Sequence, residues 1–223
     1  MKLTSTTQNS KLARIVADIT GDGHLQLDNR RGVVSFYSKD IEKIKKEDGL
    51  FQDVFCIKGH IYTYTKRSIR YGIMFTSKEL AKFLSKLGTP VGSKVSSKFL
   101  IPDWIFSGKK EIKRAYLLGM FTGEGSIYKS KHSGWRLEIE QYKLSTLSTF
   151  RNKYMKQLKK MVEDFGIKCS PVMCCRKNER KDKSITEAWK FYIWKGSFKI
   201  FYKEIGFDDN IKMEKLNEAI NAG

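Results

Sequence analysis

The stretch A-R-I-V-A-D-I-T-G-D-G-H-L, residues 13–25, predicts an apolar helix that ends on an acid between two glycines. The chain repeats the pattern in residues 115–127, which read A-Y-L-L-G-M-F-T-G-E-G-S-I. The acid is Asp22 in the first copy and Glu124 in the second, and each follows a threonine and a glycine. Two copies with matching ends predict two related halves of the chain.

Both predicted helices carry a small residue at every fourth position. These residues are Ala13, Ala17 and Gly21 in the first helix and Ala115, Gly119 and Gly123 in the second. Residues four apart share one face of a helix, so two such faces can approach more closely than the usual 8–10 Å between axes. Parallel packing along these faces places Asp22 and Glu124 side by side at the C-terminal ends.

This position is unfavourable for an acid. A carboxylate at a helix C-terminus faces the negative end of the helix dipole, at a cost of roughly 0.3–1 kcal/mol. Two neighbouring carboxylates also repel each other, which raises the pKa of one of them. A divalent cation reverses the sign of both effects, and Mg²⁺ is typically bound by one or two carboxylates together with phosphate oxygens. The pattern therefore favours functional acids over capping residues.

The same order of elements follows each motif. In the first half we expect strands at 24–28 and 32–38, a helix at 39–46, strands at 55–65 and 68–75, and a helix from the N-cap Ser77 to Gly88. In the second half, after a helix at about 110–123, we expect strands at 126–131 and 135–142, a helix at 145–165, strands at 172–178 and 188–194, and a helix at 197–206. Residues 208–220 form an additional helix without a counterpart.

This order predicts an α+β protein with two αββαββα subdomains related by a pseudo-two-fold axis. Each subdomain is an antiparallel four-stranded sheet with helices on one face, and the other face is left for a partner. In the strand 135–142, alternation places Leu137, Ile139 and Gln141 on the core side. The proline- and serine-containing residues 89–109 form the linker between subdomains 1–88 and 110–223.

The charge of the chain restricts the class of partner. Forty-three Lys and Arg residues against 24 Asp and Glu residues give a net charge of +19. This surplus indicates a polyanionic partner, nucleic acid first and an anionic membrane surface second. The four cysteines show no CxxC pair, which argues against structural zinc. Without a signal peptide or an 18-residue apolar run, we expect a soluble intracellular protein with no membrane partner.

Residues 15–23 and 117–125 resemble the motif of the LAGLIDADG homing endonuclease family, in its single-chain form with two motifs. The second copy is close to the L-L-G-x-x-x-G-[DE]-G variant of that motif. The first copy departs from it at Asp18, where an apolar residue is usual. The segment Ile101-Pro102-Asp103-Trp104-Ile105 is also similar to segments of such proteins. The two motifs and the order of elements extend the resemblance over nearly the whole chain.

The resemblance implies a monomeric protein whose two sheets form a saddle over the major groove of double-stranded DNA. Asp22 and Glu124, with Gly21 and Gly123, would hold Mg²⁺ between the two scissile phosphates, and Mn²⁺ or Ca²⁺ could replace it for binding. The expected reaction is a double-strand break at a long, nearly asymmetric site.

The family also places a lysine and often a glutamine near the attacking water. By position these are Lys195 and Gln141 in the second half. In the first half Tyr37 stands at the place of the glutamine, and the lysine position falls ambiguously on Thr76 or Lys78.

The strands and hairpins supply the expected base-reading residues. In the first half they are Gln26, Asp28, Arg30, Arg31, Ser35, Tyr37, Lys66, Arg67 and Arg70. In the second half they are Lys129, Lys131, Arg136, Glu138, Glu140, Arg176 and Lys190. Arginine can bind guanine, glutamine can bind adenine, and acids can accept from cytosine. The basic loop 178–184 is expected to bind phosphates.

Three functions remain open at this stage. The first is a sequence-specific endonuclease, which the retention of both acids favours. The second is a binding protein, either a maturase for its own intron RNA or a DNA-binding protein without cleavage. The third is a basic interaction protein whose duplication is only architectural. Because no Cys or Ser nucleophile opens the chain and no His-Asn pair closes it, we expect a free-standing protein rather than an intact intein.

Overall fold

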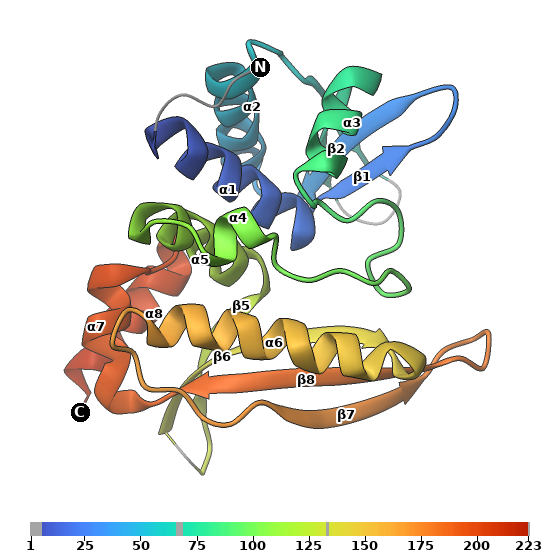
Figure 1. Cartoon of the computed structure of the whole chain (residues 1–223). Coiled ribbons are helices and arrows are strands. Elements are labelled where there is room, and N and C mark those ends of the chain that lie inside the picture. The colour runs from blue at the N-terminus through green and yellow to red at the C-terminus, as the bar shows by residue number, and fades with distance from the viewer. Residues whose placement is uncertain (1–5, 66–68, 133, 223) are drawn as a thin grey trace.

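Two helices that end on the paired acids lie at the centre of the molecule (Figure 1). The computed structural model describes residues 6–65, 69–132 and 134–222. The first half runs α1 (Thr6–Thr20), β1 (His24–Leu27), β2 (Gly32–Ser38), α2 (Ile41–Phe55), β3 (His60–Tyr64), β4 (Arg70–Thr76) and α3 (Lys78–Lys86). The second half runs α5 (Lys110–Glu124), β5 (Gly125–Ser130), β6 (Gly134–Leu144), α6 (Ser148–Glu163), β7 (Met173–Glu179), β8 (Ile185–Ile193), α7 (Phe198–Glu204) and α8 (Asn210–Asn221). The predicted αββαββα order is confirmed in both halves.

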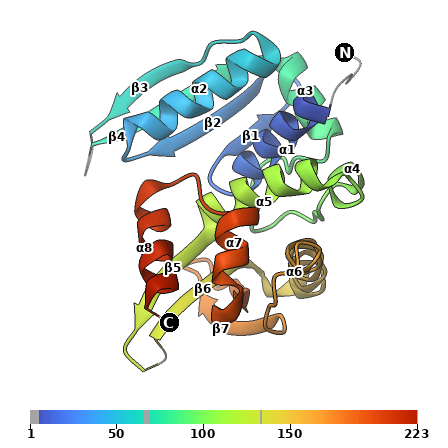
Figure 2. The same ribbon diagram turned by 90° about the vertical axis from the view of Figure 1, so that its left-hand side faces the viewer.

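Each half contains one four-stranded antiparallel sheet, in the orders β1-β2-β4-β3 and β5-β6-β8-β7. Helix α2 packs on β2 and β4, and α6 packs on β6 and β8. Figure 2 shows α2 along the first sheet, with α1 and α5 between the two halves. The side chains of each sheet that point away from its helices form what we name the open face.

The small faces of α1 and α5 are in contact, as the sequence predicts. A Cβ atom at Gly119 would lie 2.7 Å from Ala17 Cβ and 2.7 Å from Asp18 Oδ1. Glycine is therefore needed at this crossing, since real Cβ atoms do not approach so closely. Ala13 and Ala17 are fully buried here and join the core of the second half.

The two hydrophobic cores share α1. Leu12, Ile15 and Ile19 face the first core, under α2 and α3. Ala13, Val16 and Ala17, on the other side of the same helix, belong to the second. The segment between the halves also contributes, because it contains the short helix α4 (Asp103–Phe106) and buries Ile101 and Ile105 in the second core. The proposed domain boundary at 89–109 stays a prediction.

The predicted limits of one helix and one strand are wrong. We expect a helix at 39–46 followed by a strand from residue 55, whereas α2 continues to Phe55 and β3 begins at His60. Phe51 and Val54 are buried against the sheet on the same side of α2 as Ile44. The helix ends at Cys56, which has a φ of 55° and donates its N–H to the Gln52 carbonyl. Asp48 takes one place on this buried face, where its Oδ1 accepts from the Gly59 N–H at 2.7 Å, and so interrupts the apolar period in the sequence.

No helix in the described part of the chain is long and apolar enough to cross a membrane.

The close crossing of α1 and α5 gives a stability prediction. Gly119→Ala places a methyl group against Ala17 and Asp18, and we expect it to lower the free energy of unfolding by about 1–3 kcal/mol. The matched control is Gly49→Ala in α2, where no atom lies within 4 Å of the added Cβ. That change should raise stability by about 0.5–1 kcal/mol. Urea unfolding checks both, and equal effects of the two variants would contradict the assignment of Gly119 to a tight contact.

Candidate active site and nucleic-acid interface

Asp22 and Glu124 meet at the C-terminal ends of the crossed helices. A Cβ at Gly21 would lie 3.6 Å from Glu124 Cγ, and a Cβ at Gly123 would lie 3.3 Å from Asp22 Oδ2. Each acid therefore lies over the glycine that precedes the other acid. Asp22 is exposed and Glu124 is half-buried. The two motifs thus form one site, with one carboxylate from each half of the chain.

The electrostatics of the pair are as unfavourable as the sequence implied. Burial, and then the Asp22 carboxylate, raise the pKa of Glu124 above its ordinary value. Lys94, Arg151 and Lys212 lower that pKa without cancelling the effect. A cation bound between the two carboxylates would reduce their repulsion and favour their charged forms.

Lys94, in the segment between the halves, lies at the end of α1. Its ammonium donates to the carbonyl oxygens of Ile19 (3.3 Å), Gly23 (2.9 Å) and Gly21. These carbonyls carry the negative end of the helix dipole, so the ammonium stabilises the helix terminus. The Gly21 carbonyl, an expected metal ligand, therefore already accepts a hydrogen bond.

Lys212, in α8, does the same for α5. Its ammonium donates to the carbonyl oxygens of Thr122 (2.6 Å) and Gly125 (2.7 Å). Burial lowers the pKa of both Lys94 and Lys212, while the charges of Asp22 and Glu124 raise it. One lysine thus stands at the end of each motif helix, within electrostatic range of both acids.

Neither of these two lysines was expected at the site from the sequence. Lys94 lies in a segment without periodicity, and Lys212 lies in the helix that has no counterpart in the first half. Neither lysine lies in an element of the repeated αββαββα order, so a comparison of equivalent elements in the two halves would miss both. The usable signal is chemical, because the C-terminus of a helix that ends on an acid needs a cation nearby.

The expected catalytic residues Gln141 and Lys195 occupy different surroundings. Gln141 is 5% exposed on the helix side of β6 and accepts a hydrogen bond from Arg151 of α6, whose charge also acts on Glu124. Lys195 is exposed in the short turn between β8 and α7 and borders a cavity with Trp135 and Trp194. The structure places Lys94 and Lys212 beside the acids, and the catalytic role of Lys195 stays a prediction.

The segment that carries Lys94 is fixed to both halves. The Gly92 N–H donates to the Leu25 carbonyl of β1 (2.8 Å), and the Leu144 N–H of β6 donates to the Val95 carbonyl (3.1 Å). Lys143, which is 1% exposed, donates to the Lys94 carbonyl at 3.0 Å. Burial, and then the Arg151 charge, lower the pKa of Lys143 to about 7. These contacts hold the Lys94 ammonium over the end of α1.

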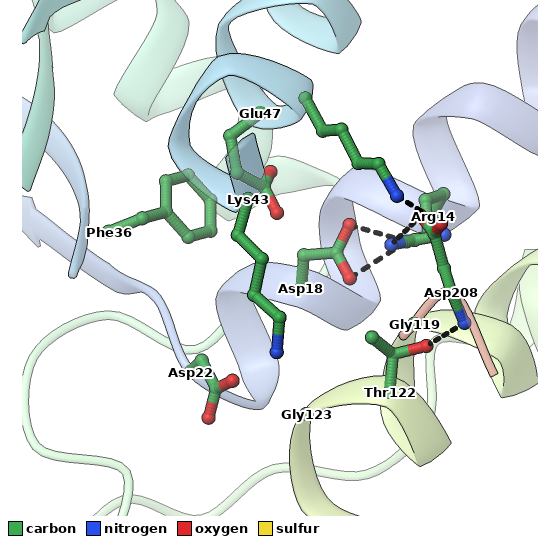
Figure 3. Close-up of a pocket in the computed structure, with 11 residues that line it drawn as sticks. Arg14, Asp18, Asp22, Phe36, Lys43, Glu47, Gly119, Thr122, Gly123 and Asp208 are labelled. Carbon is green, nitrogen blue, oxygen red and sulfur yellow. Dashed lines mark hydrogen bonds and ion pairs between the residues drawn. The ribbon is translucent and has the colours of Figure 1, made fainter. Parts of the chain in front are cut away.

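A small cavity of about 50 Å³ lies beside Asp22 and distinguishes the two half-sites (Figure 3). Asp18 lines it and accepts two hydrogen bonds from Arg14 Nε, at 2.6 and 2.9 Å. Arg14 also binds Asp208 at 3.0 Å. Burial raises the pKa of Asp18 to about 6, although Arg14 lowers it. Asp18, the departure from the family pattern, thus joins a buried charge network.

The second motif has no charges at the same places. Tyr116 and Met120 replace Arg14 and Asp18, and the Tyr116 hydroxyl lies 2.9 Å from the Tyr154 hydroxyl. Tyr154 also donates to the Met120 sulfur at 3.6 Å. The first motif helix therefore carries a charged pair beside a cavity, whereas the second carries Tyr116 and Met120 at the same places.

The open face of the first sheet is aromatic at its centre. Gly72 lies between Tyr37 and Tyr62 in register, and its missing side chain leaves room for the Tyr62 ring. The rings of Tyr37 and Tyr62 meet edge to face at 6.3 Å, and His60 stacks on Tyr62 at 6.0 Å. Register places Gln26, Ser35, Tyr37 and Arg70 on this face.

Three further expected contacts of the first half, Asp28, Arg30 and Arg31, lie at the β1–β2 turn. Asp28 builds that turn, because its Oδ1 accepts from the backbone N–H groups of Arg30 (2.8 Å) and Arg31 (2.9 Å). Lys66 and Arg67 lie outside the described residues.

The open face of the second sheet is charged instead. It carries Arg136, Glu138, Glu140, Arg176 and Lys190, all expected from the sequence. Lys190 Nζ lies 3.1 Å from Glu138 Oε2 and 3.9 Å from Glu140 Oε2. Lys129 pairs with Trp135 in register and so lies on the helix side, and Lys131 lies in the β5–β6 turn.

Known proteins share this fold and part of this sequence. The sequence model of a LAGLIDADG-like domain matches residues 111–206. The homing endonuclease I-WcaI bound to its DNA recognition sequence has a similar structure, with a TM-score of 0.59 at 15% identity over 94% of this chain and 88% of that chain. The N-terminal LAGLIDADG domain of DUF199/WhiA is similar with a TM-score of 0.54 at 13% identity, over 98% and 90% of the two chains. The protein thus has the LAGLIDADG fold, and its second half carries a LAGLIDADG-like domain.

Its sequence relatives are much longer proteins. The DNA-directed RNA polymerase subunit Rpo1N of Methanocaldococcus jannaschii is 31% identical over 93% of this chain and 16% of its own length. The tRNA-splicing ligase RtcB of Methanopyrus kandleri is 30% identical over 70% of this chain and 17% of its own length. The chain thus spans about a sixth of the length of these relatives.

The raised pKa of Glu124 gives a second prediction. The folded protein binds the Glu124 proton more tightly than the unfolded chain, so ionisation of this carboxyl costs stability as the pH rises above the ordinary range of glutamate. Without metal, Glu124→Gln should therefore be more stable than the parent at pH 8, and the difference should shrink toward pH 4. Urea unfolding at several pH values in EDTA measures it, with exposed Glu214→Gln in α8 as the control. A destabilised variant at pH 8 would show that Glu124 has a structural role.

Proposed function

We propose that the protein is a sequence-specific homing endonuclease that makes a Mg²⁺-dependent double-strand break in DNA. The observation that carries the proposal is the meeting of Asp22 and Glu124 at the crossing of α1 and α5, beside two lysines. Two facing carboxylates at helix C-termini are electrostatically unfavourable, so a purely structural role does not explain them. A reaction at two phosphates, one on each strand, does use one acid from each half.

The donor set of the site suits Mg²⁺. In the part of the chain that the structure describes, no group of three or more His, Cys, Asp or Glu side chains is arranged to hold a metal. Zinc and structural calcium sites need such groups, whereas Mg²⁺ takes one or two carboxylates and keeps water and phosphate ligands. Asp22 and Glu124 would hold the ion. When bound, Mg²⁺ would polarise the scissile phosphate and lower the pKa of water next to it.

The protein's own residues have separate tasks in this proposal. The acids supply the negative charge that draws the cation to the centre of the site. The ammonium groups of Lys94 and Lys212 lie at the ends of the helices and compensate the charge that builds up on the phosphates. The open faces of the two sheets bind the DNA on either side, and the net charge of +19 supports this attraction.

The relatives support the homing part of the proposal. The names of the matched proteins describe unrelated activities, including an RNA polymerase subunit, an RNA ligase and an aminotransferase. The similarity covers less than a fifth of each of these proteins. A coding segment that moves between genes would produce this distribution. The solved structure of I-WcaI on its DNA recognition sequence supports DNA as the substrate class.

One observation favours a second function, DNA binding without cleavage. Lys94 donates to the Gly21 carbonyl and so competes with a metal ion for this oxygen. If the ammonium stays there on DNA, the site binds its target without cutting it. The two functions differ in whether Mg²⁺ reaches the acids.

The acids provide the direct test. Asp22→Asn and Glu124→Gln should each lower the cleavage rate of a selected site by at least about 100-fold. Each variant removes a carboxylate that would hold Mg²⁺ beside the scissile phosphate. Binding of the same DNA in Ca²⁺ should stay within about threefold. Sites are first selected from a random library with the parent protein, and cleavage and binding are then measured on one of them. A parent protein that binds a selected site but never cuts it would support the second function.

The lysines provide a separate test, which decides between the structure and the sequence-based expectation. We expect Lys94→Met and Lys212→Met to slow cleavage by about 10- to 100-fold with little change in binding, because each removes a cation near the phosphates. Lys195→Met should cleave at close to the parental rate. Single-turnover cleavage rates check this, and the opposite ranking would restore Lys195 as the catalytic lysine.

A further inference from the structure

A β-bulge in the edge strand of the second sheet directs one arginine onto the open face. Cys174 pairs with Trp189 and Arg176 with Ala188, so Cys175 is an extra residue in β7. In a regular ladder without the bulge, Cys175 would pair with Ala188, and Arg176 would pair with Glu187 and point to the helix side. Bulges occur next to functional sites, where they redirect side chains. Figure 1 shows β7 at the edge beside β8, with β6 next.

The bulge brings two residues onto the same carboxylate. Arg176 Nη2 lies 3.0 Å from Glu140 Oε1, and the Cys175 Sγ donates to Glu140 Oε2 at 3.2 Å. Lys190 Nζ lies 3.9 Å from Glu140 Oε2 and is itself held by Glu138. Both oxygens of Glu140 are thus fixed, and its side chain is only 16% exposed.

Arg176 remains accessible although it is oriented. Its side chain is 56% exposed, and its guanidinium lies 5.9 Å from the centre of the Tyr142 ring. The carboxylate engages one edge of the guanidinium, and the planar group keeps further N–H donors for a ligand. A fixed, planar fork of donors matches the O6 and N7 acceptors of guanine in the major groove. A lysine at this place would offer only a point charge.

The carboxylate of Glu140 beside Arg176 favours an uncharged base edge over a phosphate as the ligand of the arginine. A free arginine on a basic surface binds any phosphate, which adds affinity but no sequence preference. Glu140 neutralises this attraction and repels phosphate oxygens, whereas the uncharged edge of a base meets no such penalty. Hydrogen bonds from Cys175 and Tyr142 and the charges of Arg176 and Lys190 outweigh burial and hold the pKa of Glu140 below its usual range, so the repulsion persists at neutral pH.

We propose that Arg176 reads one guanine of the target DNA and that Glu140 is the positioning residue that holds it away from phosphates. This inference rests on the proposed DNA recognition and adds the base that one residue reads. β5 begins directly after Glu124, and Ser126 of β5 pairs with Glu138, two residues before Glu140. The guanine therefore belongs to the half-site cut beside Glu124.

A matched ion pair elsewhere on the surface provides the control. Arg114 Nη2 lies 2.6 Å from Glu204 Oε2, with side chains 45% and 20% exposed. This pair joins helices α5 and α7 and carries the same charges at similar exposure. Arg114→Gln and Glu204→Gln thus repeat the charge changes of Arg176→Gln and Glu140→Gln outside the sheet.

The experiment selects bound sites from a randomised DNA library in Ca²⁺ with the parent and each variant, so it does not require cleavage. The parent should prefer guanine at one position, and Arg176→Gln and Arg176→Lys should each weaken that preference at least about fivefold while leaving other positions unchanged. Glu140→Gln should raise affinity for random DNA and steepen its salt dependence by about one charge. Both control variants should select the parental site, and thermal unfolding confirms that all variants fold.

Two results would overturn the inference. In the first, Arg176→Gln weakens binding to all sequences equally and lowers the salt dependence by about one, as loss of a phosphate contact does. In the second, Glu140→Gln and Glu204→Gln have the same effect on binding to random DNA. A parent protein that selects no common site would refute the proposed DNA recognition itself, which is a separate outcome.

Discussion

The close crossing of α1 and α5 is the contact on which the rest of the molecule depends. Gly119 permits it, because a side chain there would overlap Ala17 and Asp18. The crossing sets the relation of the two sheets, since α1 belongs to the first core on one side and to the second core on the other. It also brings Asp22 and Glu124 together from distant parts of the chain. One packing contact therefore determines both the architecture and the site.

The acids concentrate negative charge at the ends of α1 and α5, and two lysines partly neutralise it. Helix C-termini carry partial negative charge, and each motif adds a carboxylate to it. Lys94 and Lys212 come from segments outside the two repeats, and their ammonium groups donate hydrogen bonds to carbonyl oxygens at the helix ends. The same ammonium groups interact electrostatically with Asp22 and Glu124, to which the proposed reaction would bring the phosphates. Stabilisation of the helix ends and a role in catalysis are thus compatible in a single side chain.

The two halves share a fold but differ in their polar chemistry. The first half has a charged cavity beside its acid and an aromatic open face, around Asp18 and Tyr62 respectively. The second half has an aromatic interior at Tyr116 and a charged open face at Glu140 and Arg176. In the proposed function, the two open faces would read different half-sites, because each offers a different pattern of donors, acceptors and rings. We therefore expect a target without two-fold symmetry.

The sequence by itself determined the fold class, the order of the elements and the pair of acids. Local signals carry all three, because small residues at every fourth place and matching helix ends are visible in short stretches. It did not reveal the length of α2, where the buried Asp48 interrupts the apolar period. Only the tertiary structure revealed that Lys94 and Lys212 lie beside the acids, while Lys195 lines a cavity with Trp135 and Trp194. Carbonyl oxygens at a helix end accept a cation from any segment that passes nearby, and which segment passes is decided by packing.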